Sequence, residues 1–302
     1  MLDIHAHLFW DSYDADRDEV VRRAREAGVE KMICVGTSPQ DNPQAIAVAE
    51  KYDGIFASVG LHPHFFNEIG KEISNSKLQV PNRSQITNSK IQNLVEELRS
   101  LAGNSKVVTI GECGLDYYIR QSADSSQQKI ITDTQKTFQK EGFLAQIGLA
   151  EKLKLPLIIH TRPSVGSQDA YEDMFELLQA KSGTLKAILH CYQGDTEITK
   201  RFLALPNVCF SFAGTITYPV KQAAVGTKDD PAEVVKLVPL ERMFVETDCP
   251  FLAPQDKRGE RNEPVYVRMT AERVCAMQGT TMSALETALD GNFQRVFASR
   301  KV

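Results

Sequence analysis

The sequence predicts an α/β protein that forms a (β/α)8 TIM-type barrel as a single domain over residues 1–302. Three observations support this prediction. Short apolar runs alternate with longer helical patterns along the chain, eight runs have strand character, and no linker or internal repeat divides them. An open, doubly wound parallel sheet is the alternative, and the strand count favours the barrel.

The first three strand–helix units are regular. Strands are expected over 2–4, 31–35 and 55–59. A helix is expected over 16–27, where the apolar residues fall on one face and Gly28 ends the helix. A second helix, over 43–52, begins with Pro43 at a favourable first helical position.

The regular alternation is interrupted over 67–105. Residues 74–89 are rich in Ser, Asn, Gln and Pro and poor in apolar residues. This composition predicts a solvent-exposed insertion near 67–89, followed by a helix over 91–101.

The alternation then resumes and continues to the end of the chain. Strands are expected over 107–110, 157–159, 186–189, 208–212 and 243–245. Helices are expected over 134–154, 171–180 and 196–205, with one or two short ones in 218–238. Two helices close the chain after a loop over 250–264.

Every histidine lies at or just beyond the carboxyl end of a predicted strand. These residues are His5, His7, His62, His64, His160 and His190. The carboxylates Glu112 and Asp248 occupy equivalent places after two further strands. Because the carboxyl ends of parallel strands meet at one face of a barrel, we expect these side chains to converge there.

Such a set of imidazoles and carboxylates can hold one or two divalent ions, with Mg, Mn and Zn all compatible. A pair of ions needs a shared ligand, and Glu112 is the expected bridge. The remaining ligands divide into His5, His7 and Asp248 for one ion and His160 and His190 for the other. Asp248 is also placed to accept a proton from the attacking water.

The six cysteines form no C-x-x-C pair, a pattern typical of reduced thiols in a cytoplasmic or nuclear protein. Cys113, Cys191 and Cys249 each adjoin a proposed ligand, and we interpret them as spectators, because a one-residue step along a strand reverses the side chain. No apolar run is long enough to cross a membrane, and no signal peptide is expected.

Charge indicates a phosphate-bearing substrate. The net charge of -4 argues against a protein that coats nucleic acid by bulk charge. Local cations are nevertheless present: Arg162 follows His160, and the segment 257–264 is basic and includes Arg261. Arginine suits the geometry of phosphate, so these residues favour such a substrate.

Seven motifs occur in an order that resembles TatD-type metal-dependent deoxyribonucleases of the amidohydrolase-like superfamily. They are DIHAHL (3–8), GLHPH (60–64), GECGLDY (111–117), IHTR (159–162), LHCYQG (189–194), ETDCP (246–250) and RNEP (261–264). The resemblance extends from Asp3 to Phe297. It implies a TatD-like hydrolase domain, a divalent metal centre and hydrolysis of DNA phosphodiester bonds, often from a 3′ end.

The resemblance also assigns roles to individual residues. It implies metal binding by the same six ligands: His5, His7, Glu112, His160, His190 and Asp248. Catalysis is assigned to Asp248 and Glu112, and substrate contacts to His62, Arg162, Arg261 and Asn262. DNA is the expected partner, with no membrane association and no obligate protein partner. One departure concerns Arg162, which in the family is often followed by an acidic residue that this chain lacks.

Two other functions remain open. The same centre could serve an amidohydrolase-type deacylase or esterase, for example on aminoacyl-tRNA, because an activated water can also attack a carbonyl. The cations favour phosphate, and no oxyanion donor can be placed from the sequence. A metal-binding protein without turnover is disfavoured because structural metal sites are closed and need fewer ligands.

Overall fold

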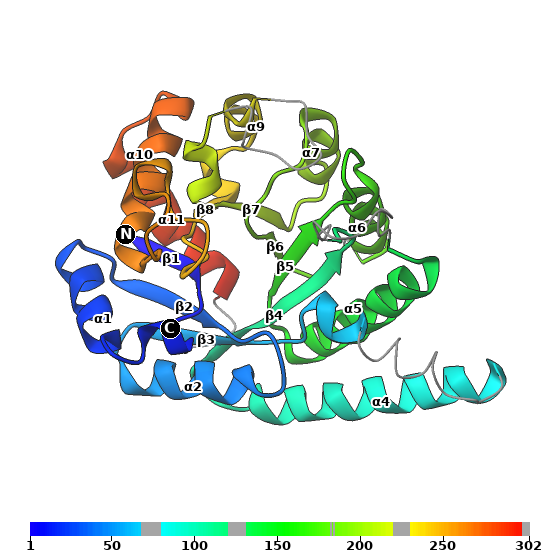
Figure 1. Ribbon diagram of the computed structural model, residues 1–302. Helices are drawn as coiled ribbons and strands as arrows, with labels where there is room; N and C mark the ends of the chain where they lie inside the picture. Colours follow the sequence, from blue (N-terminus) through cyan, green and yellow to red (C-terminus); the bar gives the residue numbers. More distant parts are fainter. Residues whose placement is uncertain (68–79, 120–130, 182, 184, 220–229, 298–302) are drawn as a thin grey trace.

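A computed structural model describes residues 1–67, 80–119, 131–181, 183, 185–219 and 230–297, with only the backbone of 80–88. Eight parallel strands follow one another around a single sheet in chain order. They are β1 (Leu2–Ala6), β2 (Lys31–Val35), β3 (Ile55–Val59), β4 (Val107–Asp116), β5 (Leu157–Arg162), β6 (Ala187–Leu189), β7 (Val208–Phe212) and β8 (Met243–Val245). Figure 1 shows these strands in the centre, surrounded by helices.

The sheet closes on itself where the segment after β8 meets β1. Ala6 and Cys249 form a parallel bridge. The backbone amide of Asp248 donates to the carbonyl of His5 at 2.8 Å, and that of His7 donates to the carbonyl of Cys249 at 2.8 Å. The predicted (β/α)8 barrel is therefore confirmed, and the open-sheet alternative is wrong.

The strands are apolar because both of their faces are covered. All ten residues of β4 are buried, as are all five of β1 and β7. One face of each strand fills the barrel interior and the other packs against the helices, the arrangement expected of an all-parallel sheet.

Helices pack against the barrel: those before β8 connect successive strands, and two more follow β8. They include α1 (Arg17–Glu26), α2 (Asp41–Lys51), α4 (Val80–Leu101), α5 (Asp133–Leu153), α6 (Asp169–Gln179), α7 (Thr196–Leu203), α9 (Pro231–Leu237), α10 (Val267–Gln278) and α11 (Met282–Phe297). A capping box between Thr132 and Gln135 fixes the start of α5. None of the described helices is both long and apolar enough to span a bilayer.

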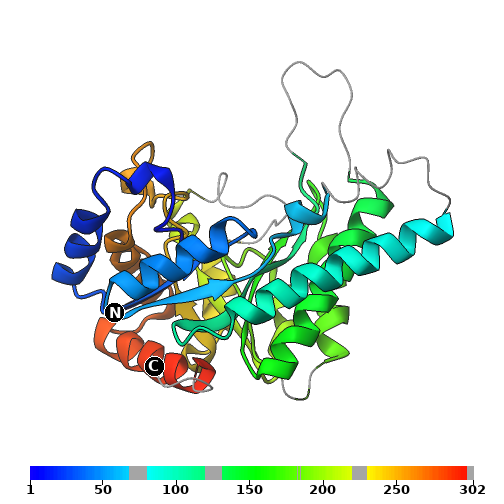
Figure 2. The same ribbon diagram turned by 90° about the horizontal axis from the view of Figure 1, so that it is seen from below.

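The structure corrects part of the predicted insertion. Helix α4 begins at Val80, so residues 80–89 are helical, whereas 68–79 lie outside the described residues. Pro81 stands in the first turn, where a missing amide hydrogen leaves no bond unmade. Ile91 and Leu98 are buried, and Figure 2 shows the N-terminal end of α4 projecting beyond the neighbouring helices. Polar composition was therefore a poor guide to helix content here.

Three strands are longer than predicted. Strand β4 continues to Asp116 and β5 to Arg162, so Glu112 and His160 lie within strands and not beyond them. His5 likewise lies within β1. Three of the predicted metal ligands thus lie within strands, and the pairing register shifts beside two of them, between Asp3 and Ala6 in β1 and between Ile110 and Cys113 in β4.

Candidate metal centre

A cavity of about 920 Å³ opens at the carboxyl ends of the strands. Five of the six predicted metal ligands line it: His7, Glu112, His160, His190 and Asp248. His5 lies beneath them and is fully buried. The structure therefore brings together all six residues, which come from separate parts of the barrel.

One group of donors forms around β1 and the segment after β8. The Nε2 atoms of His5 and His7 are 3.2 Å apart. His5 Nε2 is 3.4 Å from Glu112 Oε2, and His7 Nε2 is 3.4 Å from Asp248 Oδ1. Asp248 has a positive φ of 57°, a backbone conformation that is uncommon for aspartate and is typical of functional sites.

A second group forms on the other side of Glu112. Its Oε1 atom lies 2.9 Å from His160 Nδ1 and 3.0 Å from His190 Nε2, and these two nitrogens are 3.2 Å apart. The two oxygens of Glu112 therefore face different histidine pairs. This is the geometry that a carboxylate shared between two cations requires.

Outer hydrogen bonds determine which nitrogen carries the proton in three of the four histidines. In the described part of the chain, Nδ1 of the fourth, His5, is buried without a hydrogen-bond partner. His7 Nδ1 lies 2.7 Å from the carbonyl of Val35, and His160 Nε2 lies 3.2 Å from Asp116 Oδ2. His190 Nδ1 lies 3.3 Å from Glu246 Oε1. Because those oxygens accept, the facing nitrogens must donate, and the opposite nitrogen of each neutral ring has a free lone pair.

These lone pairs point at carboxylate oxygens and at one another. Such an arrangement is repulsive unless a proton or a metal cation lies between the donors. Borderline nitrogen ligands combined with carboxylates suit divalent zinc, manganese and, in part, magnesium. The donor set therefore fits a divalent metal centre.

Charge around Glu112 is consistent with this conclusion. Burial would raise the pKa of Glu112, but His190, His62 and His160 lower it well below its usual value. Burial likewise opposes protonation of His160, whereas hydrogen bonds to Asp116 and Glu112 raise its pKa to about 9. The carboxylates thus place strong negative potential where the imidazole lone pairs converge.

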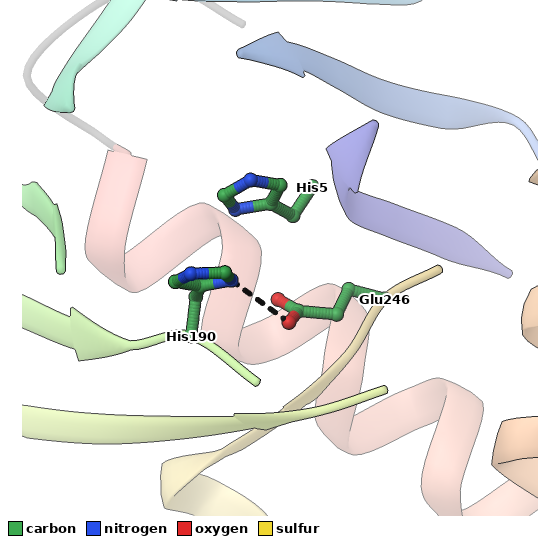
Figure 3. A group of neighbouring side chains, drawn as sticks. All are labelled: His5, His190 and Glu246. Carbon is green, nitrogen blue, oxygen red and sulfur yellow. Dashed lines mark hydrogen bonds and ion pairs between the residues drawn. The ribbon is translucent and has the colours of Figure 1, made fainter. Parts of the chain in front are cut away.

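Glu246 lies below the centre and has contacts that sequence reasoning missed (Figure 3). The rings of His5 and His190 stack with centroids 4.0 Å apart, and Glu246 lies beside both of them. Glu246 is fully buried, and its Oε1 also accepts the backbone amide of Cys191 at 2.6 Å. The sequence offered one signal for a role of Glu246, which is its position two residues before the proposed ligand Asp248.

Asp116 is the second residue that sequence reasoning left without a role. It is almost fully buried, and its Oδ2 atom lies 2.9 Å from Nε2 of the exposed His64 as well as facing His160. Asp116 follows Glu112 by four residues within β4. This carboxylate therefore connects His64 to a proposed metal ligand.

The cysteines do not contribute to the converging donors. Within the described residues, each group that could hold a metal consists of histidines and carboxylates. Cys113 and Cys249 are buried, and Cys113 Sγ faces the carbonyl of Ile158. Cys191 lines the cavity. Their interpretation as spectators stays a prediction.

Two of the predicted substrate contacts lie at the cavity. His62 and Arg162 both line it, and His62 Nε2 is 3.6 Å from Glu112 Oε1. The guanidinium of Arg162 lies 3.8 Å above the centre of the Tyr118 ring. Both side chains are therefore accessible to a molecule in the cavity, and their role in substrate binding stays a prediction.

Arg261 and Asn262 have other partners and are not among the described residues that line the cavity. Arg261 forms ion pairs with Asp16 at 2.7 Å and with Glu263 at 2.9 Å. Asn262 is fully buried and donates to the carbonyls of Thr247 and Phe251. In this structure both residues stabilise the loop after β8, and their contact with substrate stays a prediction.

A profile of the family described as TatD related DNase matches residues 2–298. The chain belongs to this family. It is 33% identical to YabD of Bacillus subtilis, named an uncharacterized metal-dependent hydrolase, over 98% of each protein. It is 29% identical to the 3′-5′ ssDNA/RNA exonuclease TatD of Cronobacter sakazakii, over 98% of this chain and 97% of that protein.

The fold comparison agrees with this membership. The crystal structure of the TatD homologue YJJV from Escherichia coli has a TM-score of 0.77 to this structure at 24% identity, covering 99% of this chain and 98% of that one. The resemblance inferred from the motifs is thus confirmed. As a TatD-family protein, the chain is a metal-dependent hydrolase with a candidate metal centre of histidines and carboxylates.

Proposed function

We propose that this TatD-family protein is a metal-dependent nuclease that hydrolyses DNA phosphodiester bonds from a 3′ end. The observation that carries the proposal is Glu112, whose two oxygens face separate histidine pairs at the floor of an open cavity. Relatives that are 29% identical over nearly their whole length are named 3′-5′ ssDNA/RNA exonucleases, which supports the same substrate class.

We further propose that the centre holds two divalent ions. His5, His7 and Asp248 would hold one ion, and His160 and His190 the other, with Glu112 shared. When bound, such ions polarise the phosphodiester and lower the pKa of a nearby water toward neutrality. Mg, Mn and Zn are all compatible with this donor set.

The chain's own residues then orient the substrate and move the proton. Burial would raise the pKa of Asp248, but the neighbouring His7, His5 and His190 lower it. The side chain lines the cavity, so its carboxylate can accept the proton of the attacking water. His62 Nδ1 accepts the backbone amide of His64 at 3.2 Å. In the neutral ring the proton must therefore be on His62 Nε2, which can donate to a phosphate oxygen.

Arg162 supplies the positive charge expected beside a phosphate. A deacylase or esterase whose substrate has no phosphate would not need this cation, whereas a deacylase of aminoacyl-tRNA would still meet phosphates. The same centre could nevertheless attack a carbonyl, and the substrate test therefore includes esters and amides.

The test is an assay of metal-stripped protein reconstituted with Mg, Mn or Zn. Substrates are single- and double-stranded DNA labelled at the 3′ or the 5′ end, beside a panel of esters and amides that includes aminoacyl-tRNA. We expect immediate release of the 3′ label and progressive shortening of 5′-labelled strands, only with metal present. Turnover of an ester or amide with intact DNA would refute the proposal.

We propose the cytoplasm or nucleus as the working compartment. All six cysteines are free in the structure, which suits a reducing environment. Cell fractionation tests this location, and recovery in an oxidising compartment would contradict it.

A further inference from the structure

Two large aromatic side chains are exposed at the mouth of the cavity. Trp10 is 40% and Phe251 44% exposed, and both line the cavity. Their rings meet edge to face, with centroids 5.0 Å apart. The other large exposed hydrophobic residues in the described part of the chain, Leu144 and Val165, are not among those lining the cavity. Single exposed apolar residues are ordinary, whereas a contacting aromatic pair at a cavity mouth indicates a binding role.

The aromatic pair is attached directly to one side of the metal centre. The Phe251 ring lies 6.2 Å from the ring of His7, centroid to centroid. The backbone amide of Phe251 donates to the carbonyl of Asp248 at 3.0 Å. The rings of His7, Phe251 and Trp10 thus form a line from the proposed ligands to solvent.

The opposite side of the cavity is polar and cationic. Arg162 and His64 lie there, next to His160 and the end of β5. The cavity therefore has an aromatic side near β1 and β8, a cationic side near β5, and the proposed metal centre between them. A nucleotide has the same division, with a planar aromatic base on one side of the phosphate and the charged backbone continuing on the other.

We propose that Trp10 and Phe251 form a base-stacking subsite for single-stranded nucleic acid. This inference rests on the proposed function and names the part of the substrate that the centre does not bind. An unpaired base can leave its neighbours and lie against the aromatic pair, whereas a paired base in a duplex must first lose its own stacking and pairing. Every base has an aromatic face, so the subsite selects single strands with little regard to sequence.

The chain offers a direct probe, because Trp10 is its only tryptophan. The experiment titrates the Mg-loaded protein with a phosphorothioate tetramer of thymidine, and with a matched tetramer of 5,6-dihydrothymidine. Dihydrothymine keeps the hydrogen-bonding edge of thymine but loses its aromatic ring. We expect the thymidine tetramer to quench Trp10 fluorescence and to bind about 5- to 100-fold more tightly than the dihydro tetramer.

Fluorescence anisotropy of end-labelled tetramers extends the comparison to the variants Trp10→Ala and Phe251→Ala. We expect either substitution to weaken thymidine binding and reduce the discrimination, with the double variant binding both tetramers equally. Phe251→Tyr should retain the discrimination because it keeps the ring. Leu144→Ala removes an equally exposed side chain elsewhere and should change nothing. Metal content and circular dichroism check that each variant is loaded and folded.

Equal affinity of the wild-type protein for the two tetramers would overturn the subsite, as would discrimination that persists in the double variant. Binding needs no turnover, so the two proposals fail separately. A protein that discriminates between the tetramers but does not cleave DNA retains the subsite and loses the proposed function. A protein that cleaves DNA but does not discriminate between the tetramers retains the proposed function and loses the subsite.

Discussion

At the residue scale, the metal centre depends on hydrogen bonds to the ring nitrogens that face away from Glu112. Val35, Asp116 and Glu246 each accept from the outward nitrogen of a proposed ligand. Each bond turns the free lone pair of a neutral ring toward Glu112. Such outer partners fix the ring and raise its basicity as a ligand.

Glu246→Gln tests this role. The substitution keeps the size of the side chain but removes the negative charge that faces His190, so we expect metal affinity to fall by about tenfold or more. Competition with a coloured chelator measures the change. Glu260→Gln, on the exposed loop after β8, is the matched control. Unchanged affinity in Glu246→Gln would mean that this carboxylate does not orient the ligand.

The sequence predicted which side chains converge inside the barrel. It did not predict which residues orient those side chains through hydrogen bonds. Histidines are rare enough that six at strand ends predicted a common site. Asp116 and Glu246 are carboxylates, which are frequent in this chain, and they act through other residues. Only the three-dimensional positions of His160 and His190 reveal what these carboxylates do.

At the element scale, strands were predictable and loops were not. Strands β2, β3, β7 and β8 have the predicted bounds, because buried parallel strands are nearly continuous apolar runs. The loop after β8 was interpreted from its charge, its expected position at the strand ends and its RNEP motif. Lys257 pairs with Glu260 within the loop, whereas Arg261 pairs with Asp16 from a distant segment, a contact that no local pattern reveals.

This difference gives a paired prediction for two arginines. Arg162→Ala removes a cavity cation, so we expect KM for DNA to rise about 3- to 30-fold with an unchanged melting temperature. Arg261→Ala breaks ion pairs with Asp16 and Glu263, so we expect the free energy of unfolding to fall by about 1–3 kcal/mol with little change in KM. Steady-state kinetics and thermal denaturation separate the two effects, and the reverse pattern would show that the loop binds substrate.

At the scale of the whole molecule, barrel closure creates the first donor group. Hydrogen bonds between β1 and the segment after β8 join the first strand of the barrel to the last. They place Asp248 beside His5 and His7, 241 to 243 residues away in sequence. Residues 1–7 therefore belong both to the barrel wall and to the candidate metal centre.

The most direct test of the central claim is metal stoichiometry in Glu112→Ala, measured by mass spectrometry beside hydrolysis of 3′-labelled DNA. Since both donor groups share Glu112, we predict two ions per wild-type chain and a sharp loss of bound metal in the variant. The variant should show no detectable turnover, and its circular dichroism should remain that of a folded barrel. A folded variant that keeps the metal content and turnover of the wild-type protein would contradict Glu112 as the shared ligand.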